Sequence, residues 1–187
     1  MVEPGHSSLP HLELDRRAVA VKLVLTDCDG VLTDAGVYYS ERGEELKRFS
    51  LRDGMGVELL RDSGLGTAII TRERSLVVQK RAEKLKLPFL FEGVRDKHAH
   101  LPEIMRATGF SAGELAYIGD DVNDLPIMVE IAERGGLIAA PADAIDQVTK
   151  VVHYRTKAFG GFGAFREFAD LILRLRKGGR ADPRDTQ

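Results

Sequence analysis

The sequence predicts an α/β fold, a three-layer α/β/α sandwich with a mostly parallel sheet and helices on both of its faces. Short apolar runs rich in β-branched residues alternate along the chain with segments of helical period. Polar residues directly follow several of these runs, among them Asp27, Thr71 and Asp120. Since ligands bind outside the carboxyl ends of the strands in such sheets, we expect these residues at one crevice.

Each expected strand is a short apolar run bounded by turn residues. These runs cover residues 21–25, 65–70, 88–91, 115–118, 136–140 and 151–154. The intervening helices are expected over residues 55–61, 75–85, 97–108, 125–132, 142–148 and 163–176. Asp53 is placed to cap the first of these helices, and Gly64 is placed to end it.

A β-hairpin is expected between the first strand and the first helix. Residues 36–40 and 46–50 have strand character and flank the loop 41–45, which contains a glycine. Such a hairpin would overhang the tip of the first strand, where it either shapes the pocket as a flap or is only an additional edge hairpin.

Length and composition indicate a single domain. At 187 residues, of which 43% are hydrophobic, the chain can bury one substantial core, which we place at residues 19–177. Residues 1–18 show no clear period and are expected to form a loose arm, and residues 178–187 are expected to form a polar tail.

The charge and hydropathy patterns argue against two classes of partner. The formal net charge is -2 with both signs interspersed, so the chain lacks the basic field that drives nucleic-acid binding. No stretch approaches the roughly 20 apolar residues of a membrane span, and the polar start lacks the order of a signal peptide. We therefore expect a cytoplasmic protein without membrane contact.

Asp27 and Asp29 follow the first expected strand and carry a chemical signal. Two carboxylates one residue apart repel unless a cation lies between them, and Mg²⁺ held by oxygen ligands is the ordinary solution. Asp27 could then attack phosphorus, while Asp29 could protonate the departing alkoxide and later deprotonate water. The pattern Asp-x-Asp-Gly is also typical of a solvated turn after a strand, and the local sequence leaves both interpretations open.

A second group of acids follows the strand expected at residues 115–118. Asp120, Asp121 and Asp124 begin a helix there, and helix capping explains one of them but not three. Asp120 is nearest the strand end, so we expect it to bind the metal directly, together with the Asp27 carboxylate and the main-chain carbonyl of Asp29. Asp121 and Asp124 would act through water, and Asn123 would start the helix or face the phosphate.

Cys28 and two histidines are expected to have no role in the chemistry. Cys28 is the only cysteine, and if Asp27 and Asp29 face the site, strand alternation points Cys28 into the packing. The pattern His98-x-His100 could suggest a zinc site. Residues two apart on a helix face different ways, however, so we do not expect these histidines to bind one metal ion.

The segment DCDGVLTD at residues 27–34 resembles the first motif of the haloacid dehalogenase phosphohydrolases. Ile70-Thr71 resembles the second motif, Lys97 the third, and GDDVND at residues 119–124 the fourth. This resemblance implies an aspartyl-phosphate mechanism in which Thr71 and Lys97 hold the phosphoryl oxygens. Thr71 offers a hydroxyl and a backbone N–H for that purpose.

Residues 51–56 and 160–167 resemble the small, capless members of this superfamily, which are phosphatases of keto-deoxy sugar acids. Their substrates are 3-deoxy-manno-octulosonate 8-phosphate or nonulosonate 9-phosphates such as N-acylneuraminate 9-phosphate. The resemblance implies a phosphorylated sugar acid as the small-molecule partner, no separate cap domain, and a homotetramer in which the hairpin covers neighbouring sites.

The second motif departs from the family pattern. Relatives place glycine after the Thr or Ser, whereas this chain has Arg72, which puts the loop conformation in doubt. Arg72 could instead contact phosphate or carboxylate. The next residue, Glu73, matches the glutamate that the nonulosonate branch tends to carry at this position, whereas the octulosonate branch tends to carry arginine. Arg72 and Arg74 weaken this distinction, because a one-residue shift of the loop would present an arginine instead.

Other functions remain to be weighed. A non-catalytic assembly module associated with sugar-nucleotide synthesis should have broken motifs, whereas the acids here are intact. A phosphorylated receiver domain has a similar set of aspartate, threonine and lysine, but it should place its acid pair and its phosphorylated aspartate on different strands. Asp27 and Asp29 share one strand tip.

Overall fold

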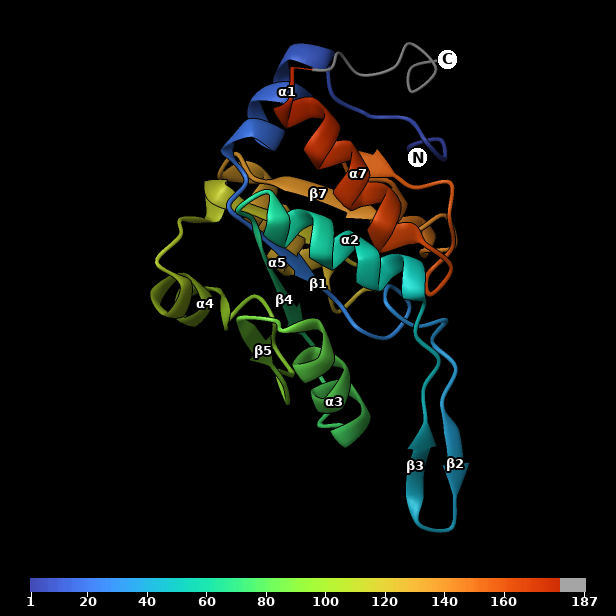
Figure 1. The fold of residues 1–187 in the computed structure, drawn as a ribbon. Coiled ribbons are helices and arrows are strands. Elements are labelled where there is room, and N and C mark those ends of the chain that lie inside the picture. Colours follow the sequence, from blue (N-terminus) through green and yellow to red (C-terminus); the bar gives the residue numbers. More distant parts are fainter. Residues whose placement is uncertain (179–187) are drawn as a thin grey trace.

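The centre of the molecule is a six-stranded sheet. A computed structural model describes residues 1–178. The strands of the sheet are β1 Leu23–Thr26, β4 Gly66–Ile70, β5 Phe89–Phe91, β6 Leu115–Ile118, β7 Leu137–Ala140 and β8 Tyr154–Arg155. Their order is β5-β4-β1-β6-β7-β8, and every neighbouring pair is parallel (Figure 1).

Strand β1 lies at the point where the strand order reverses. It pairs with β4 on one side and with β6 on the other, so that Leu25 lies beside Ala68 and Tyr117. In open parallel sheets a crevice for ligands forms at such a reversal, outside the carboxyl ends of the strands. The ends of β1, β4 and β6 therefore meet at one place.

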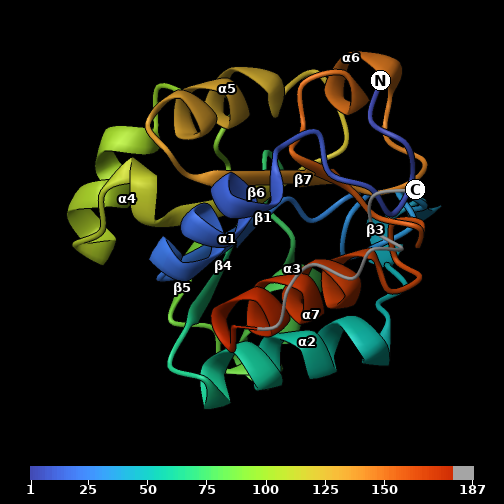
Figure 2. The same ribbon diagram turned by 90° about the horizontal axis from the view of Figure 1, so that it is seen from above.

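Helices cover both faces of the sheet, as Figure 2 shows from above. One layer contains α1 His11–Ala20, α2 Leu51–Asp62, α3 Leu76–Leu85 and α7 Ala164–Arg176, and the other contains α4 Leu101–Thr108, α5 Leu125–Glu133 and α6 Asp146–Thr149. Alternate strand residues enter the two cores: Val24 packs with the first layer and Leu25 with the second. The predicted three-layer sandwich is confirmed.

The N-terminal segment differs from the loose arm that we expected. Helix α1 buries Leu14 and Ala18 against the first layer. Before it, the Val2 N–H donates to the Thr149 carbonyl at 3.0 Å and the Ser8 N–H to the His153 carbonyl at 2.9 Å. A ten-residue helix with two buried positions gives little periodic signal in the sequence. Of the expected polar tail 178–187, all residues beyond Gly178 lie outside the described part of the chain.

Helix α2 begins four residues earlier than predicted, and its cap is not Asp53. The Ser50 hydroxyl accepts the Arg52 N–H at 3.1 Å. Asp53 lies inside the first turn, only 2% exposed, where its Oδ1 accepts the Arg166 N–H at 2.9 Å. Asp53 therefore links the start of α2 to the start of α7 and does not serve as the N-cap of α2.

Other boundaries shift while the elements keep their types. Helix α4 begins at Leu101 and not at Lys97, because Pro102 fits the first turn of a helix, so Lys97 lies in the turn before it. Helix α6 is shorter than the predicted 142–148, and β8 begins at Tyr154. A short 3₁₀ helix, Ala112–Glu114, precedes β6 and was not predicted.

The hairpin consists of the antiparallel strands β2 Tyr38–Ser40 and β3 Gly43–Leu46 and projects from the body of the molecule (Figure 1). Residues 47–50, which we expected to extend its second strand, instead lead back to α2. Between β1 and β4 the chain forms only this hairpin and α2, so the expected absence of a separate cap is confirmed. No helix within residues 1–178 is long and apolar enough to cross a membrane.

Candidate active site

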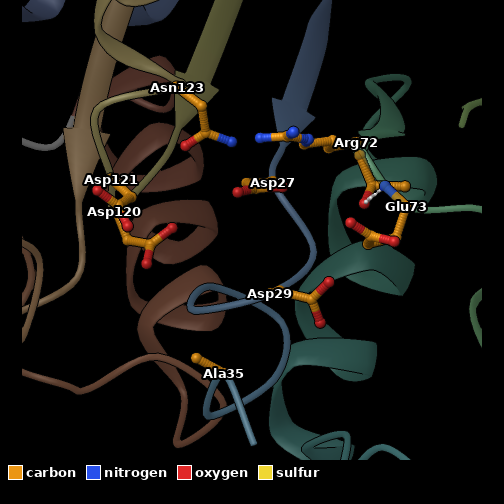
Figure 3. Close-up of a pocket in the computed structure, with 9 residues that line it drawn as sticks. Asp27, Asp29, Ala35, Arg72, Glu73, Asp120, Asp121 and Asn123 are labelled. Carbon is orange, nitrogen blue, oxygen red and sulfur yellow. Dashed lines mark hydrogen bonds between the residues drawn. The ribbon is translucent and has the colours of Figure 1, made fainter. Parts of the chain in front are cut away.

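A pocket opens at the carboxyl ends of β1, β4 and β6 (Figure 3). Its lining is mostly acidic and consists of Asp27, Asp29, Ala35, Thr71, Arg72, Glu73, Asp120, Asp121 and Asn123. Asp27, Thr71 and Asp120 come from the ends of three different strands, and the structure brings them together as predicted. Of the predicted site residues, Lys97 and Asp124 lie beneath this lining.

A buried network lies beneath the pocket floor. Lys97 Nζ is 2.9 Å from Asp27 Oδ1 and 2.6 Å from Asp124 Oδ1, and the Tyr117 hydroxyl donates to the same Asp124 oxygen at 2.6 Å. The Lys97, Tyr117 and Asp124 side chains are almost fully buried. We call Asp27, Lys97, Tyr117, Asp120 and Asp124 the inner cluster. The resemblance, and not the local pattern, pointed to Lys97, which the structure places beside Asp27, whereas nothing in the sequence pointed to Tyr117.

Asp124 has the bonds of a structural residue more than those of a direct metal ligand. Its Oδ1 accepts hydrogen bonds from Lys97 Nζ and the Tyr117 hydroxyl. Its Oδ2 accepts hydrogen bonds from the backbone N–H groups of Asp120 at 3.0 Å and Asp121 at 3.4 Å. Both oxygens are thus engaged by the protein, which agrees with the expectation that Asp124 acts indirectly.

The geometry and charge of the cluster suit a divalent cation. Oxygen atoms of Asp27, Asp120 and Asp124 all lie within 4.8 Å of one another. The buried Asp120 Oδ1 accepts no hydrogen bond from the described residues. Burial, followed by the charge of Asp124, raises the pKa of Asp27 to about 7, and burial with the charge of Asp27 raises the pKa of Asp120 to about 8. A hard cation bound to these oxygens would relieve that repulsion.

Two glycines allow the backbone to approach this cluster closely. Gly30 has a φ of 92°, and a Cβ there would lie 2.0 Å from Asp120 Oδ2. A Cβ on Gly160 would lie 1.9 Å from the Gly30 carbonyl oxygen. The glycine of Asp-x-Asp-Gly is therefore required by the site itself, which counts against a simple solvated turn.

Asp29 belongs to a different set of contacts. Lys47 Nζ lies 2.7 Å from both of its carboxylate oxygens, and the Thr33 hydroxyl donates to Asp29 Oδ1 at 3.3 Å. Lys47 also lies 3.5 Å from Glu44 Oε2, and Glu44 accepts a hydrogen bond from Ser75 Oγ. We call Asp29, Glu44, Lys47 and Ser75 the outer network.

Lys47 was missed by sequence reasoning. In the run Leu46-Lys47-Arg48 two basic residues are adjacent, and the sequence does not distinguish Lys47 from Arg48. In the structure Leu46 is 63% exposed, whereas Lys47 is 9% exposed. The side chains are thus reversed from the usual preference, and no local pattern reveals such a reversal. Only the acid that meets Lys47 across the chain explains it.

Thr71 is correctly placed but offers less than expected. Its backbone N–H donates to the Phe91 carbonyl at 2.8 Å, as part of the pairing of β4 with β5, so this N–H is not available for phosphate. The hydroxyl lines the pocket and accepts the Glu73 N–H at 3.2 Å, which leaves its own proton for a ligand.

The loop after Thr71 tolerates Arg72 in place of glycine. Arg72 keeps a negative φ, and the Gly93 N–H donates to the Glu73 carbonyl at 3.2 Å, which holds the loop. In Figure 3 the Arg72 and Asn123 side chains extend toward each other across the pocket above Asp27. Glu73 lines the pocket, whereas Arg74 packs beside Gly93.

Cys28 lies in the packing as expected, whereas the two histidines lie in the turn before α4 and not on a helix as predicted. Cys28 is fully buried in the core of the first helical layer, and burial raises the pKa of its thiol. His98 Nε2 lies 3.9 Å from Glu130, and the His100 ring packs edge-on against Phe91 with centroids 5.7 Å apart. The histidines have different partners, and the metal-binding group found among residues 1–178 contains only carboxylates.

Comparison with known proteins places the chain among sugar-acid phosphatases. No protein-family model matches it. It is 39% identical over 158 residues to the 3-deoxy-D-manno-octulosonate 8-phosphate phosphatase KdsC of Yersinia pestis, covering 84% of this chain and 82% of that protein. It is 36% identical over 156 residues to KdsC of Haemophilus influenzae, covering 83% and 84%.

A solved structure shares the fold over most of its length. The Moraxella catarrhalis 3-deoxy-D-manno-octulosonate 8-phosphate phosphatase, in complex with magnesium, phosphate and KDO, superposes with a TM-score of 0.82 at 34% identity, covering 89% of this chain and 94% of that one. Sequence and fold agree, and the chain belongs to the 3-deoxy-D-manno-octulosonate 8-phosphate phosphatase family of the HAD superfamily.

Proposed function

We propose that this protein is a Mg²⁺-dependent phosphatase that hydrolyses the phosphate monoester of a keto-deoxy sugar acid through an aspartyl-phosphate on Asp27. The observation that carries this proposal is the setting of Asp27. Its Oδ1 is held by Lys97 at 2.9 Å and by the Cys28 N–H at 2.7 Å, while the residue lines the pocket beside Asp120. A carboxylate fixed by one oxygen presents the other to a phosphorus atom.

Each proton and bond has an assigned place in this reaction. Asp27 attacks phosphorus, the bond to the sugar oxygen breaks with its electron pair, and Asp29 gives its proton to that oxygen. Water then attacks phosphorus and passes a proton to Asp29, and the bond between phosphorus and the Asp27 oxygen breaks. The Thr71 hydroxyl and Lys97 stabilise negative charge on the transferring group.

The metal would be held by Asp27, Asp120 and the main-chain carbonyl of Asp29, with Asp121 and Asp124 further out. The orphaned Asp120 Oδ1 and the raised pKa values of Asp27 and Asp120 support this assignment. Bound Mg²⁺ would neutralise charge between the carboxylates and the phosphate dianion. Without it, a pocket this acidic would repel its substrate.

Two substrates fit this class, and the relatives favour one of them. The similar proteins are named for 3-deoxy-D-manno-octulosonate 8-phosphate, which supports that substrate for this chain. Glu73 favours a nonulosonate 9-phosphate such as N-acylneuraminate 9-phosphate, since it lines the pocket and can accept hydrogen bonds from hydroxyl or amide groups. Arg72 and Asn123 flank the same opening and would contact phosphate or sugar.

Specificity constants for both sugar-acid phosphates with Mg²⁺ test the proposal directly. We expect hydrolysis of at least one, and Glu73→Arg should shift the preference toward the octulosonate by about tenfold or more, because it removes the acceptor for the hydroxyl or amide groups of the nonulosonate. Turnover of neither substrate would overturn the proposed function. An unchanged preference in Glu73→Arg would remove only Glu73 from it.

We further propose a cytoplasmic homotetramer with a single phosphatase domain, which includes helix α1 as well as the predicted residues 19–177. The projecting hairpin, with Tyr38, Tyr39 and Leu46 each more than 60% exposed, supports contact with a second subunit. Light scattering during turnover should give four copies, and an active monomer would contradict this. A non-catalytic assembly module is not favoured, because the acids of the pocket are intact and placed together.

A further inference from the structure

The ion pair between Lys47 and Asp29 joins the hairpin to the pocket. The Lys47 side chain is only 1% exposed, and both Asp29 oxygens lie 2.7 Å from its ammonium group. Lysine is rarely buried because the charged group loses its water, and only a close partner compensates that cost. Burial alone would lower the pKa of Lys47, but its hydrogen bonds and charge interaction with Asp29 raise it.

The remaining contacts of Lys47 come from elements that surround the pocket. Lys47 follows β3 directly and lies 3.5 Å from Glu44 Oε2 in that strand. Glu44 in turn accepts a hydrogen bond from Ser75, whose hydroxyl caps α3 by accepting the Val78 N–H at 3.3 Å. The outer network thus connects the hairpin, the start of α3 and the loop after β1.

Lys47 reaches Asp29 without lining the pocket itself. Asp29 is among the lining residues and Lys47 is not. In Figure 3 the Asp29 carboxylate points away from Asp27, whose own carboxylate turns toward Asp120. The described side-chain contacts of the Asp29 carboxylate come from Lys47 and Thr33, so these two residues set where it lies at the pocket.

We propose that Lys47 is a positioning residue for Asp29: its ammonium group orients the Asp29 side chain, which gives a proton to the leaving oxygen when it is protonated and, as the resulting carboxylate, later takes one from water. The proposal rests on the proposed phosphatase function. Because Lys47 directly follows β3 and contacts Glu44 in that strand, the proton-transfer step depends on the base of the hairpin, while attack by Asp27 depends on the sheet.

The test compares Lys47→Met with Arg48→Met in the Mg²⁺-loaded protein. Arg48, the next residue, pairs with Asp34 at 2.9 Å and donates to the Gly161 carbonyl at 2.8 Å but does not touch Asp29, so its substitution removes a neighbouring ion pair and leaves the Asp29 contacts in place. With a sugar-acid phosphate, Lys47→Met should lower kcat about 100-fold with KM unchanged, and Arg48→Met should lower it less than about threefold. Lys47→Arg should recover part of the loss, since it can bind both carboxylate oxygens.

An aryl phosphate separates the two steps, because nitrophenolate leaves without a proton. Lys47→Met should release one equivalent of nitrophenolate rapidly and then turn over slowly, since hydrolysis of the phosphoenzyme still needs Asp29. Three results for Lys47→Met would each overturn the positioning role. These are an unchanged kcat or a raised KM with the sugar-acid phosphate, and, with the aryl phosphate, a burst rate that falls as much as the steady-state rate. Wild-type protein that hydrolyses no phosphate monoester would overturn the proposed function instead.

Retention of the fold is checked by the rise in melting temperature on adding Mg²⁺. If Lys47→Met does not fold, Glu44→Gln takes its place, because it removes the second charge beside Lys47 and keeps an acceptor for Ser75. It should lower steady-state turnover with the burst retained. Wild-type kinetics in Glu44→Gln together with wild-type kinetics in Lys47→Arg would overturn the proposal.

Discussion

The inner cluster and the outer network each hold one aspartate of the pair Asp27 and Asp29 with a buried lysine, yet they are built differently. Lys97 contacts two carboxylates and rests on strand ends and the turn before α4, all within the sheet body. Lys47 directly follows β3 of the hairpin, which projects from that body. The comparison indicates that Asp27, the proposed nucleophile, is fixed by the core, whereas Asp29, the proposed proton-transfer group, is fixed by a peripheral element.

The largest effect should follow from removing the nucleophile of the inner cluster. Asp27→Asn keeps the shape of the side chain and its bonds to the Cys28 N–H, but an amide cannot form the phosphoenzyme. We expect turnover to fall by about 10⁴-fold or more while the fold is retained. Kinetics and circular dichroism check this. Substantial turnover by protein free of wild-type contamination would end the aspartyl-phosphate mechanism.

The two lysines should differ in what their loss does to stability. Lys97→Met leaves Asp27 and Asp124 buried without their shared cation, and breaking a buried ion pair typically costs about 3–5 kcal/mol. Lys47→Met leaves Asp29 and Glu44 without their shared cation, but their side chains are 26% and 21% exposed and can be hydrated. Urea unfolding should therefore show a much larger loss for Lys97→Met, and equal losses would remove the distinction between the two regions.

The inner cluster should also make metal-free protein sensitive to pH. The pKa of Asp27 is raised from 3.8 to about 7 and that of Asp120 from 3.8 to about 8. A raised pKa contributes stability that is present below the unfolded value and is lost as pH rises through the folded value. Protein in chelator should thus lose stability between about pH 4 and 8, and added Mg²⁺ should restore it.

Asp120→Asn is the variant that isolates this effect. It removes one of the repelling carboxylates, so at pH 8 metal-free Asp120→Asn should be more stable than metal-free wild type by roughly 1–3 kcal/mol. The difference should vanish below about pH 3, where Asp120 is protonated in both states of the wild type, because its unfolded pKa is 3.8. Thermal melts with and without Mg²⁺ measure it, and a variant that still gains stability from Mg²⁺ as wild type does would contradict the metal assignment.

The same comparison explains what the sequence could predict. The strand ends at Asp27, Thr71 and Asp120 were placed correctly because apolar runs mark strands and topology then fixes their ends. Lys47 and Tyr117 were not found, since their roles depend on partners that fold next to them from distant parts of the chain. The cap at Ser50 was missed although Ser50-Leu51-Arg52-Asp53 carries a serine three residues before an acid, a usual sign of a helix start.

The smallest effect should come from Tyr117, which touches the inner cluster only through Asp124. Tyr117→Phe removes one donor at 2.6 Å, but Asp124 Oδ1 keeps Lys97 at 2.6 Å, so no charge is left alone. We expect a stability loss of about 1–2 kcal/mol and a fall in kcat of less than about tenfold with KM unchanged. Tyr154→Phe is the matched control, since its hydroxyl donates to Glu167 at 2.8 Å outside the pocket. It should lose similar stability and keep full turnover. If Tyr117→Phe also kept full turnover, the orientation of Lys97 would not depend on Tyr117, and the inner cluster would reduce to its charged members.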